Sequence, residues 1–163
     1  MEKLGVTYLD MVLLHWPFGN TYAAWRDLEV LYEEGKIRAI GISNFNPDRM
    51  IDFIKFNKIA PALNQIETHL FSQRAEEHKW LEKYGVAHQA YAPLGQGMAN
   101  EMFQTQAVQN AAAAHTERMQ ENINIFDFEL TKKEMAELRT LDTGKPMIGN
   151  AQKPELVEFA MTW

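Results

Sequence analysis

The chain has 163 residues, no cysteine and a formal net charge of −6 at pH 7, with 46% hydrophobic and 23% charged residues. This length suits one domain with a sizeable core, and the lack of cysteine excludes disulfides, thiol nucleophiles and cysteine-ligated metals. The negative charge argues against a nucleic-acid partner, no apolar run reaches the roughly 18 residues of a membrane span, and the residues after Met1 lack the pattern of a secretion signal. We therefore expect a cytoplasmic protein that is not bound to a membrane.

The first predicted element is a strand over residues 9–14 that runs into His15, Trp16 and the helix-breaking Pro17. Residues 11–14 form a continuous apolar run, which is typical of a parallel strand covered on both faces. His15 would then stand at the carboxyl end of the strand, where α/β folds place their chemistry. The same histidine could instead be a hydrogen-bonded core residue, and this stretch alone does not decide between the two.

Strands and helices alternate from there to residue 91. Asn20 or Thr21 can cap the first helix, and Asn46-Pro47 is a typical start for the second. A strand-helix-strand rhythm that repeats every 25 to 30 residues or so builds a parallel sheet or barrel. The predicted elements are a helix over 21–34, a strand over 37–42, a helix from 47, a strand over 62–66, a helix over 73–84 and a strand over 86–91.

The rest of the chain is less regular, and its sequence indicates no fifth strand. Thr131 and Glu134 have the spacing of a capping box, which predicts a helix start at that point. We interpret residues 1–163 as a single incomplete domain. The helical segments predicted in this part are 101–115, 116–125, one from about 131 to 144, and a short helix from 154.

Polar or aromatic residues follow each predicted strand. Because the carboxyl ends of parallel strands share one face, these residues would converge on one site. The convergence favours a functional role for His15 over a place in the core. The four sets are His15 with Trp16, Ser43 with Asn44, Gln65 with Glu67, and Tyr91.

Several longer segments carry a family resemblance: LLHWP at 13–17, EEGKIRAIGISNF at 33–45, NQIETH at 64–69, AYAPLG at 90–95, and RMQEN at 118–122 leading into FDFEL at 126–130. Together they resemble the aldo-keto reductases, a family of (β/α)8 barrel enzymes that reduce carbonyls with a nicotinamide cofactor. The resemblance runs from Leu4 to about Gly144. It implies an α/β fold that is part of a TIM barrel, with about four parallel strands and surrounding helices.

The resemblance also implies roles for individual residues. His15 matches the active-site histidine that orients and polarises the substrate carbonyl, and Trp16 would line the substrate pocket. Tyr91 matches the aromatic residue that stacks on the nicotinamide ring. Leu94 lies in the backbone segment that runs past the pyrophosphate. The implied substrate is a small carbonyl compound.

Two further groups match the ends of the cofactor. Hydroxyl and amide side chains suit the nicotinamide carboxamide, and the matching residues are Ser43, Asn44 and Gln65. An arginine suits the 2′-phosphate of NADP, so the implied cofactor is NADP(H). The residues that match the adenosine end are Arg118, Glu121 and Asn122.

The family's proton donor has no counterpart in these 163 residues. It is a tyrosine tuned by a lysine and supported by an aspartate, all carried on the first three strand units. The family's eighth strand, with a phosphate-holding lysine-serine pair, is also missing between His115 and Thr116. Because a general acid typically contributes ~10²- to 10⁴-fold, we expect carbonyl reduction by this chain alone to be impaired or absent.

Two alternatives remain open from the sequence. The chain is either a reductase that needs a tyrosine and lysine from another chain, or a non-catalytic truncated family member or structural fragment with at most weak nicotinamide nucleotide binding. Four strands that do not close a barrel leave unpaired edges, which invite association. We expect self-association, a complementary fragment, or a curved open sheet.

Other kinds of site are poorly supported. The sequence GQGMAN at 95–100 lacks the third glycine of a dinucleotide fingerprint. The five histidines show no metal-ligand spacing, so no metal site is predicted. His78 and Lys79 are most simply interpreted as part of a solvated helix face.

Overall fold

A computed structural model describes residues 1–114 and 129–162. They fall into two compact units. The first comprises Met1–Glu67, Arg74–Tyr91 and Gly149–Trp163, and the second comprises Thr68–Gln73 and Ala92–Ile148. The interpretation of 1–163 as a single incomplete domain stays a prediction. No helix within the described ranges is long and apolar enough to cross a bilayer.

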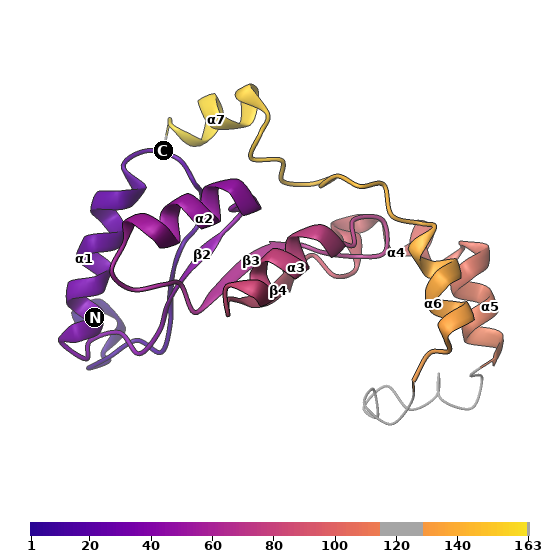
Figure 1. Ribbon diagram of the computed structural model, residues 1–163, viewed down its shortest axis with the longest axis horizontal. Helices are drawn as coiled ribbons and strands as arrows, with labels where there is room; N and C mark the ends of the chain where they lie inside the picture. Colours follow the sequence, from indigo (N-terminus) through magenta and orange to yellow (C-terminus); the bar gives the residue numbers. More distant parts are fainter. Residues whose placement is uncertain (115–128, 163) are drawn as a thin grey trace. The chain divides into compact units, whose positions relative to one another are not determined.

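The first unit is built on a four-stranded parallel sheet with the strand order β1-β2-β3-β4. Leu14 pairs with Ile42, and Ser43 pairs with Gln65, so the carboxyl ends of neighbouring strands lie side by side. The predicted parallel α/β arrangement is confirmed (Figure 1). The strands are β1 (Val12–Leu14), β2 (Ile40–Ser43), β3 (Leu63–Glu67) and β4 (Ala87–Tyr91).

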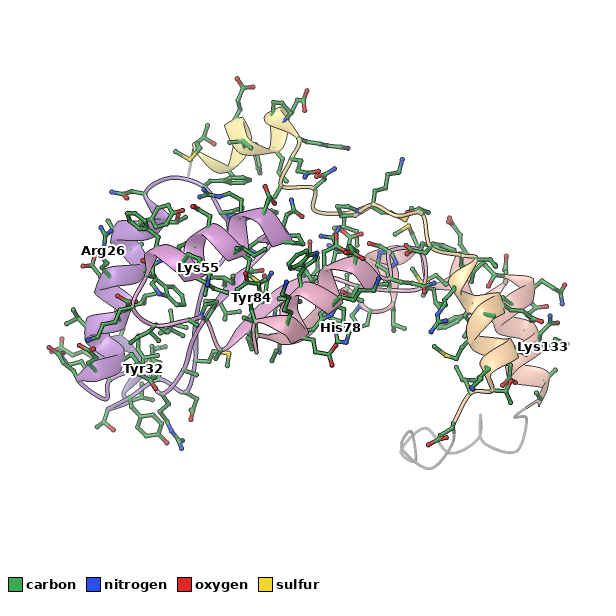
Figure 2. The ribbon with its side chains drawn as sticks, viewed as in Figure 1. Arg26, Tyr32, Lys55, His78, Tyr84 and Lys133 are labelled. Atoms are coloured by element: carbon green, nitrogen blue, oxygen red, sulfur yellow. The ribbon has the colours of Figure 1, made fainter. Side chains whose placement is uncertain are left out.

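Helices α1 (Thr21–Glu33), α2 (Pro47–Phe56) and α3 (Ala75–Lys83) connect the strands, as the sequence predicts. The Asn20 side chain accepts a hydrogen bond from the Ala23 amide at 3.3 Å and so caps α1. Proline occupies the first turn of α2. Lys55 of α2 lies 5.8 Å from the ring centroid of Tyr84, the residue that ends α3 (Figure 2).

The core of this unit lies between the helices and one face of the sheet. Trp25 and Phe45 both make edge contacts with Phe53, with ring centroids 5.1 Å apart. Ile40 and Ile42 of β2 are buried in the same cluster. Because side chains alternate along a strand, Gly41 and Ser43 point to the opposite face. That face carries the predicted site.

The sheet differs from the prediction at its first strand. Met11 is exposed and β1 is half-buried, so the interpretation as a run covered on both faces is wrong, whereas the unpaired edge expected of strands that do not close a barrel is confirmed for β1 within the described residues. The reason is that β1 ends the strand order among the described residues and pairs with β2 alone. The predicted strand over 37–42 also begins later, at Ile40, since Ile37 makes only an isolated bridge to Leu9.

The second unit is helical, and one helix differs from the prediction. The stretch expected as a single helix over 101–115 is two helices, because Thr105 interrupts it. The Thr105 hydroxyl donates a hydrogen bond to the Met102 carbonyl at 2.7 Å. The Thr105 carbonyl accepts a hydrogen bond from the Gln109 amide at 3.0 Å. The predicted segment over 116–125 lies outside the described residues. The elements are η2 (Gly95–Gly97), α4 (Ala99–Phe103), α5 (Gln106–Ala114) and α6 (Lys132–Arg139).

The capping box at the start of α6 is confirmed. The Thr131 hydroxyl accepts from the Glu134 amide at 3.3 Å, and the Glu134 carboxylate accepts from the Thr131 amide at 2.7 Å. The helix ends at Arg139, well before the expected end near Gly144. In the first unit, the short tail helix α7 (Pro154–Ala160) begins at the predicted proline, and a 3₁₀ turn η1 (Glu2–Leu4) precedes the sheet.

Candidate functional site

Side chains at the carboxyl ends of β2 and β4 form one hydrogen-bonded network with backbone carbonyl groups of His15 and Gln65. The Asn44 amide donates to the His15 carbonyl at 2.9 Å, and the Tyr91 hydroxyl donates to the Asn44 side-chain oxygen at 3.0 Å. The Ser43 hydroxyl donates to the Gln65 carbonyl at 2.8 Å. The first unit therefore brings together the predicted residues from β1, β2, β3 and β4.

Asn44 is the centre of this network. It is buried, and its φ of 63° lies in the left-handed region that few residues other than glycine adopt. Asparagine tolerates this conformation better than most, because its short amide can hydrogen-bond locally. Here the amide also reaches the Ser43 hydroxyl at 3.2 Å. The turn at the end of β2 thus aims one side chain at neighbours on both sides.

Tyr91 has a strongly perturbed hydroxyl. Burial, and the nearby Glu67 carboxylate, raise the pKa of Tyr91 to about 12, while Arg74 opposes the shift. The hydroxyl is therefore protonated at neutral pH and available to donate to Asn44. A group that holds its proton this tightly is a poor general acid near pH 7.

The tail of the chain closes against these residues. The buried Glu67 carboxylate accepts a hydrogen bond from the Gly149 amide at 2.8 Å. A Cβ added at Gly149 would stand 2.4 Å from the Tyr91 hydroxyl and 3.4 Å from Cη2 of Trp16. Only glycine fits there without displacing a neighbour. Sequence reasoning misses this contact, because nothing in the spacing of the tail relates residue 149 to residue 91.

Trp16 borders a small hollow. Its ring stacks on Phe18, with centroids 5.5 Å apart, and lies 5.3 Å from the His15 ring. The His15 side chain is exposed. The hollow has a volume of about 180 Å³ and is largely apolar, so it suits a small apolar group. It is lined by His15, Trp16, Leu156, Phe159 and Ala160.

The remaining predicted residues are less closely tied to the network. The Gln65 side-chain amide donates to Gln89 of β4 at 2.9 Å. Leu94 is 59% exposed and belongs to the second unit. The predicted adenosine residues, Arg118, Glu121 and Asn122, lie outside the described residues.

The donor set suits a carboxamide. One hydroxyl and two amides stand at adjacent strand ends, and a carboxamide offers a complementary acceptor and two donors. The side chains of Ser43, Asn44 and Gln65 have partners within the protein. A bound carboxamide would exchange with some of these hydrogen bonds rather than fill unsatisfied positions.

A four-stranded parallel sheet with polar groups gathered at its carboxyl ends is characteristic of part of an α/β barrel. The family model described as the aldo/keto reductase family matches residues 1–114. The chain therefore belongs to the aldo/keto reductase family, whose members are generally NAD(P)H-dependent carbonyl reductases.

Individual relatives agree with this assignment. The chain is 32% identical over 175 residues to 9,11-endoperoxide prostaglandin H2 reductase from Trypanosoma cruzi, an alignment that covers 91% of this chain and 62% of the relative. It is 31% identical to methylglyoxal reductase DkgA from Yersinia pestis, covering 89% of this chain and 62% of the relative. The chain thus spans about 62% of the length of the curated relatives it matches.

Solved structures confirm the partial barrel. MGS-M4, an aldo-keto reductase enzyme from a Medee basin deep-sea metagenome library, superimposes with a TM-score of 0.83 at 30% identity, covering 93% of this chain and 66% of that one. A point mutant of Gox0644 in complex with NADPH gives a TM-score of 0.77 at 22% identity, covering 93% and 66%, and supports the fold alone. The four strands described above correspond to part of such a (β/α)8 barrel.

Proposed function

We propose that this chain holds the nicotinamide end of NADP(H) in a carbonyl reductase site whose proton-donating groups come from further polypeptide. The single observation that carries the proposal is the network in which Asn44 joins His15, Ser43 and Tyr91 across the strand ends. The amide and hydroxyl groups of this network lie beside the Tyr91 ring, and this arrangement supports the proposal of nicotinamide binding. When bound, the reduced cofactor supplies the hydride.

Each part of the cofactor has its own residues in this proposal. The carboxamide binds Ser43, Asn44 and Gln65, and the ring stacks on Tyr91. Leu94 lies along the pyrophosphate. The Arg118 guanidinium binds the 2′-phosphate, which favours NADP over NAD, and Glu121 and Asn122 bind the adenine.

The substrate is a small carbonyl compound. The exposed His15 imidazole borders the hollow next to Trp16, where it can donate a hydrogen bond to a carbonyl oxygen and so polarise it. The apolar walls of the hollow take the remainder of a small substrate. His15 is the catalytic residue and Trp16 the substrate-binding residue of this chain.

Proton donation is the step that the chain does not complete on its own. Among the described residues, Tyr91 is the tyrosine that joins the network, and a pKa of about 12 makes it a weak acid at neutral pH. We infer that the isolated chain is impaired by about 10²- to 10⁴-fold or more for lack of a tuned general acid. A complementary polypeptide supplies the tyrosine and lysine and completes a single cytoplasmic domain, since a second copy of this chain would lack the same two groups.

A second candidate function is favoured by the tail. Gly149 donates to Glu67 and lies against Tyr91 and Trp16, so the chain covers part of its own site. In this alternative the chain is a non-catalytic family member that binds nicotinamide nucleotides weakly at most. The two candidates differ in whether cofactor binding leads to turnover.

Cofactor binding is tested by titrating the chain with NADPH and following nicotinamide fluorescence. The proposal predicts saturable binding that weakens at least tenfold in Tyr91→Ala and Gln65→Ala, with Lys79→Ala, an exposed residue on α3, as the unchanged control. Arg118→Ala should abolish any preference for NADPH over NADH. Equal affinity of Tyr91→Ala and the unaltered chain would contradict the proposed site.

A further inference from the structure

Two histidines meet on the side of the sheet away from the candidate site. The Nδ1 atoms of His78 and His88 lie 3.2 Å apart, with ring centroids separated by 5.3 Å and ring planes inclined by 41°. His78 projects from α3, as Figure 2 shows, and His88 belongs to β4. Both residues lie in the first unit.

The fold, not the sequence spacing, brings these imidazoles together. Ala87, Gln89 and Tyr91 alternate with His88 along β4, so His88 points to the face on which α3 packs. The chain turns back from α3 into β4 at Gly85, whose φ is 67°. Ten positions separate the two histidines, a spacing that matches no common metal-binding motif.

The separation of the two nitrogens suits a shared metal ion. Two imidazole nitrogens bound to one tetrahedral ion at roughly 2.0–2.1 Å lie about 3.3 Å apart, and square-planar ligation brings them to about 2.9 Å. We propose that His78 and His88 form a two-histidine site for a divalent transition-metal ion such as Zn²⁺, Ni²⁺ or Cu²⁺, with water completing the coordination. Neutral imidazole is a preferred ligand for all three ions.

The charges around the pair permit a cation. Arg74 stands nearby, but its guanidinium is paired with the Glu77 carboxylate at 3.2 Å, which offsets its charge. Burial, together with His78 and Arg74, lowers the pKa of His88, whereas Glu77 raises it.

The proton balance of ligation is simple. When both rings are neutral, a hydrogen bond between the two Nδ1 atoms requires the proton on Nδ1 of one ring and on Nε2 of the other. Ligation through both Nδ1 atoms moves the first proton to Nε2 of the same ring through solvent. Two neutral rings therefore bind the ion without a net release of protons.

The site would hold its ion with two protein ligands. In residues 1–114 and 129–162, no group of three or more histidine, cysteine, aspartate or glutamate side chains is placed to hold a metal ion. An open site of this kind exchanges its ion readily. Its consequence is a cross-link between α3 and β4, the strand that ends the described sheet.

The test is a calorimetric titration of the full chain with zinc chloride at about pH 7.5, with magnesium chloride as a control for hard cations. We expect one Zn²⁺ per chain, no binding of Mg²⁺, and a rise in Tm that grows with the zinc concentration. His78→Gln and His88→Gln should each weaken binding at least tenfold. His15→Gln removes a histidine away from the pair and is the matched control, with unchanged affinity.

Two results would overturn the inference. Zinc binding that survives in His78→Gln, a substitution on the surface of α3 that should leave the fold intact, would show that the pair is not the site. An equal loss in His15→Gln would show that binding occurs elsewhere. Circular dichroism of each variant identifies any loss of folding. The electron paramagnetic resonance spectrum of the Cu²⁺-loaded chain provides an independent check, because two equatorial nitrogen ligands are expected only if both imidazoles bind.

Discussion

Asn44 combines an unfavourable backbone conformation with a central place in the hydrogen-bond network. Its side chain bonds to a carbonyl at the end of β1, a hydroxyl of β2 and the Tyr91 hydroxyl of β4. A buried amide with three partners is stabilising only while all of them are present. The conformation and the contacts can be separated by substitution.

We predict that Asn44→Ala lowers the free energy of unfolding by about 2–4 kcal/mol, because it removes the hydrogen bonds and keeps a Cβ at a φ of 63° without the amide that compensates for this conformation. Asn44→Gly loses the same hydrogen bonds but tolerates the backbone, so it should be less damaging by about 1 kcal/mol. Urea denaturation measures both. Equal destabilisation by the two substitutions would mean that the backbone conformation carries no strain.

A second prediction concerns Gly149. In Gly149→Ala the added Cβ would meet the Tyr91 hydroxyl at 2.4 Å, which should lower the free energy of unfolding by about 1–3 kcal/mol and raise amide exchange in the tail. Tyr91→Phe removes the obstructing oxygen, so the alanine should be nearly neutral in that background. A double-mutant cycle by urea denaturation measures this coupling. Additive effects of the two substitutions would contradict the contact.

At the same scale, the sequence predicts some residues of the site and misses others. Ser43, Asn44 and Gln65 are predictable because they lie at the ends of apolar strand segments, and parallel strands bring such positions together. Gly149 is not predictable, since its contact depends on a long return of the chain. The approach of His78 to His88 likewise depends on how closely α3 packs on β4.

At the scale of elements, local signals succeed where they are complete. Pro47 in the first turn of α2 and the Thr131 capping box of α6 each mark a helix start, although the Asn46 side chain makes no capping hydrogen bond. The prediction of one helix over 101–115 is wrong because the residues on both sides of Thr105 favour helix. Periodicity alone does not reveal that the Thr105 hydroxyl bonds back to the Met102 carbonyl. The predicted length of the first strand is wrong, because β1 has a neighbouring strand on one side alone in the described part of the chain.

The packing of α3 on β4 should depend on pH through His88. Its pKa in the folded protein is below the ordinary value of 6.5, so the folded state binds fewer protons than the unfolded state in this range. The stabilisation from neutral His88 is therefore complete above pH 6.5 and is lost as the pH falls through the folded pKa. Arg74, His78 and Glu77 are the charged or titratable groups that contribute to this shift.

We expect the free energy of unfolding to fall more steeply between about pH 7 and pH 5 in the unaltered chain than in His88→Gln, which lacks the titrating group. Urea denaturation at a series of pH values measures the difference, and His15→Gln should keep the steep dependence. Parallel pH profiles for the unaltered chain and His88→Gln would show that His88 does not contribute.

At the scale of the whole molecule, the sheet invites further pairing. β1 and β4 end the strand order among the described residues, and unpaired parallel edges expose backbone donors and acceptors to other chains. We predict that the purified chain self-associates, with an average mass from light scattering that rises with protein concentration. A well-folded monomer with constant mass over the whole range would contradict this prediction.

Charged substitutions offer a matched test of that association. Replacing Met11, an exposed residue directly before β1, with lysine should shift the equilibrium toward monomer, because a charge beside an edge strand opposes strand pairing. Lys132→Ala, an exposed change on α6, serves as the control. An unchanged association constant for Met11→Lys would place the contact elsewhere.

The proposed function depends on the separation of cofactor binding from proton donation. The direct measurement is NADPH oxidation by the pure 163-residue chain with a small aldehyde, followed by absorbance after binding has been established by fluorescence. We predict saturable NADPH binding with no oxidation above the rate without protein. Sustained turnover by the pure chain, abolished in His15→Ala, would contradict the proposal, because the chain would then supply a proton donor of its own.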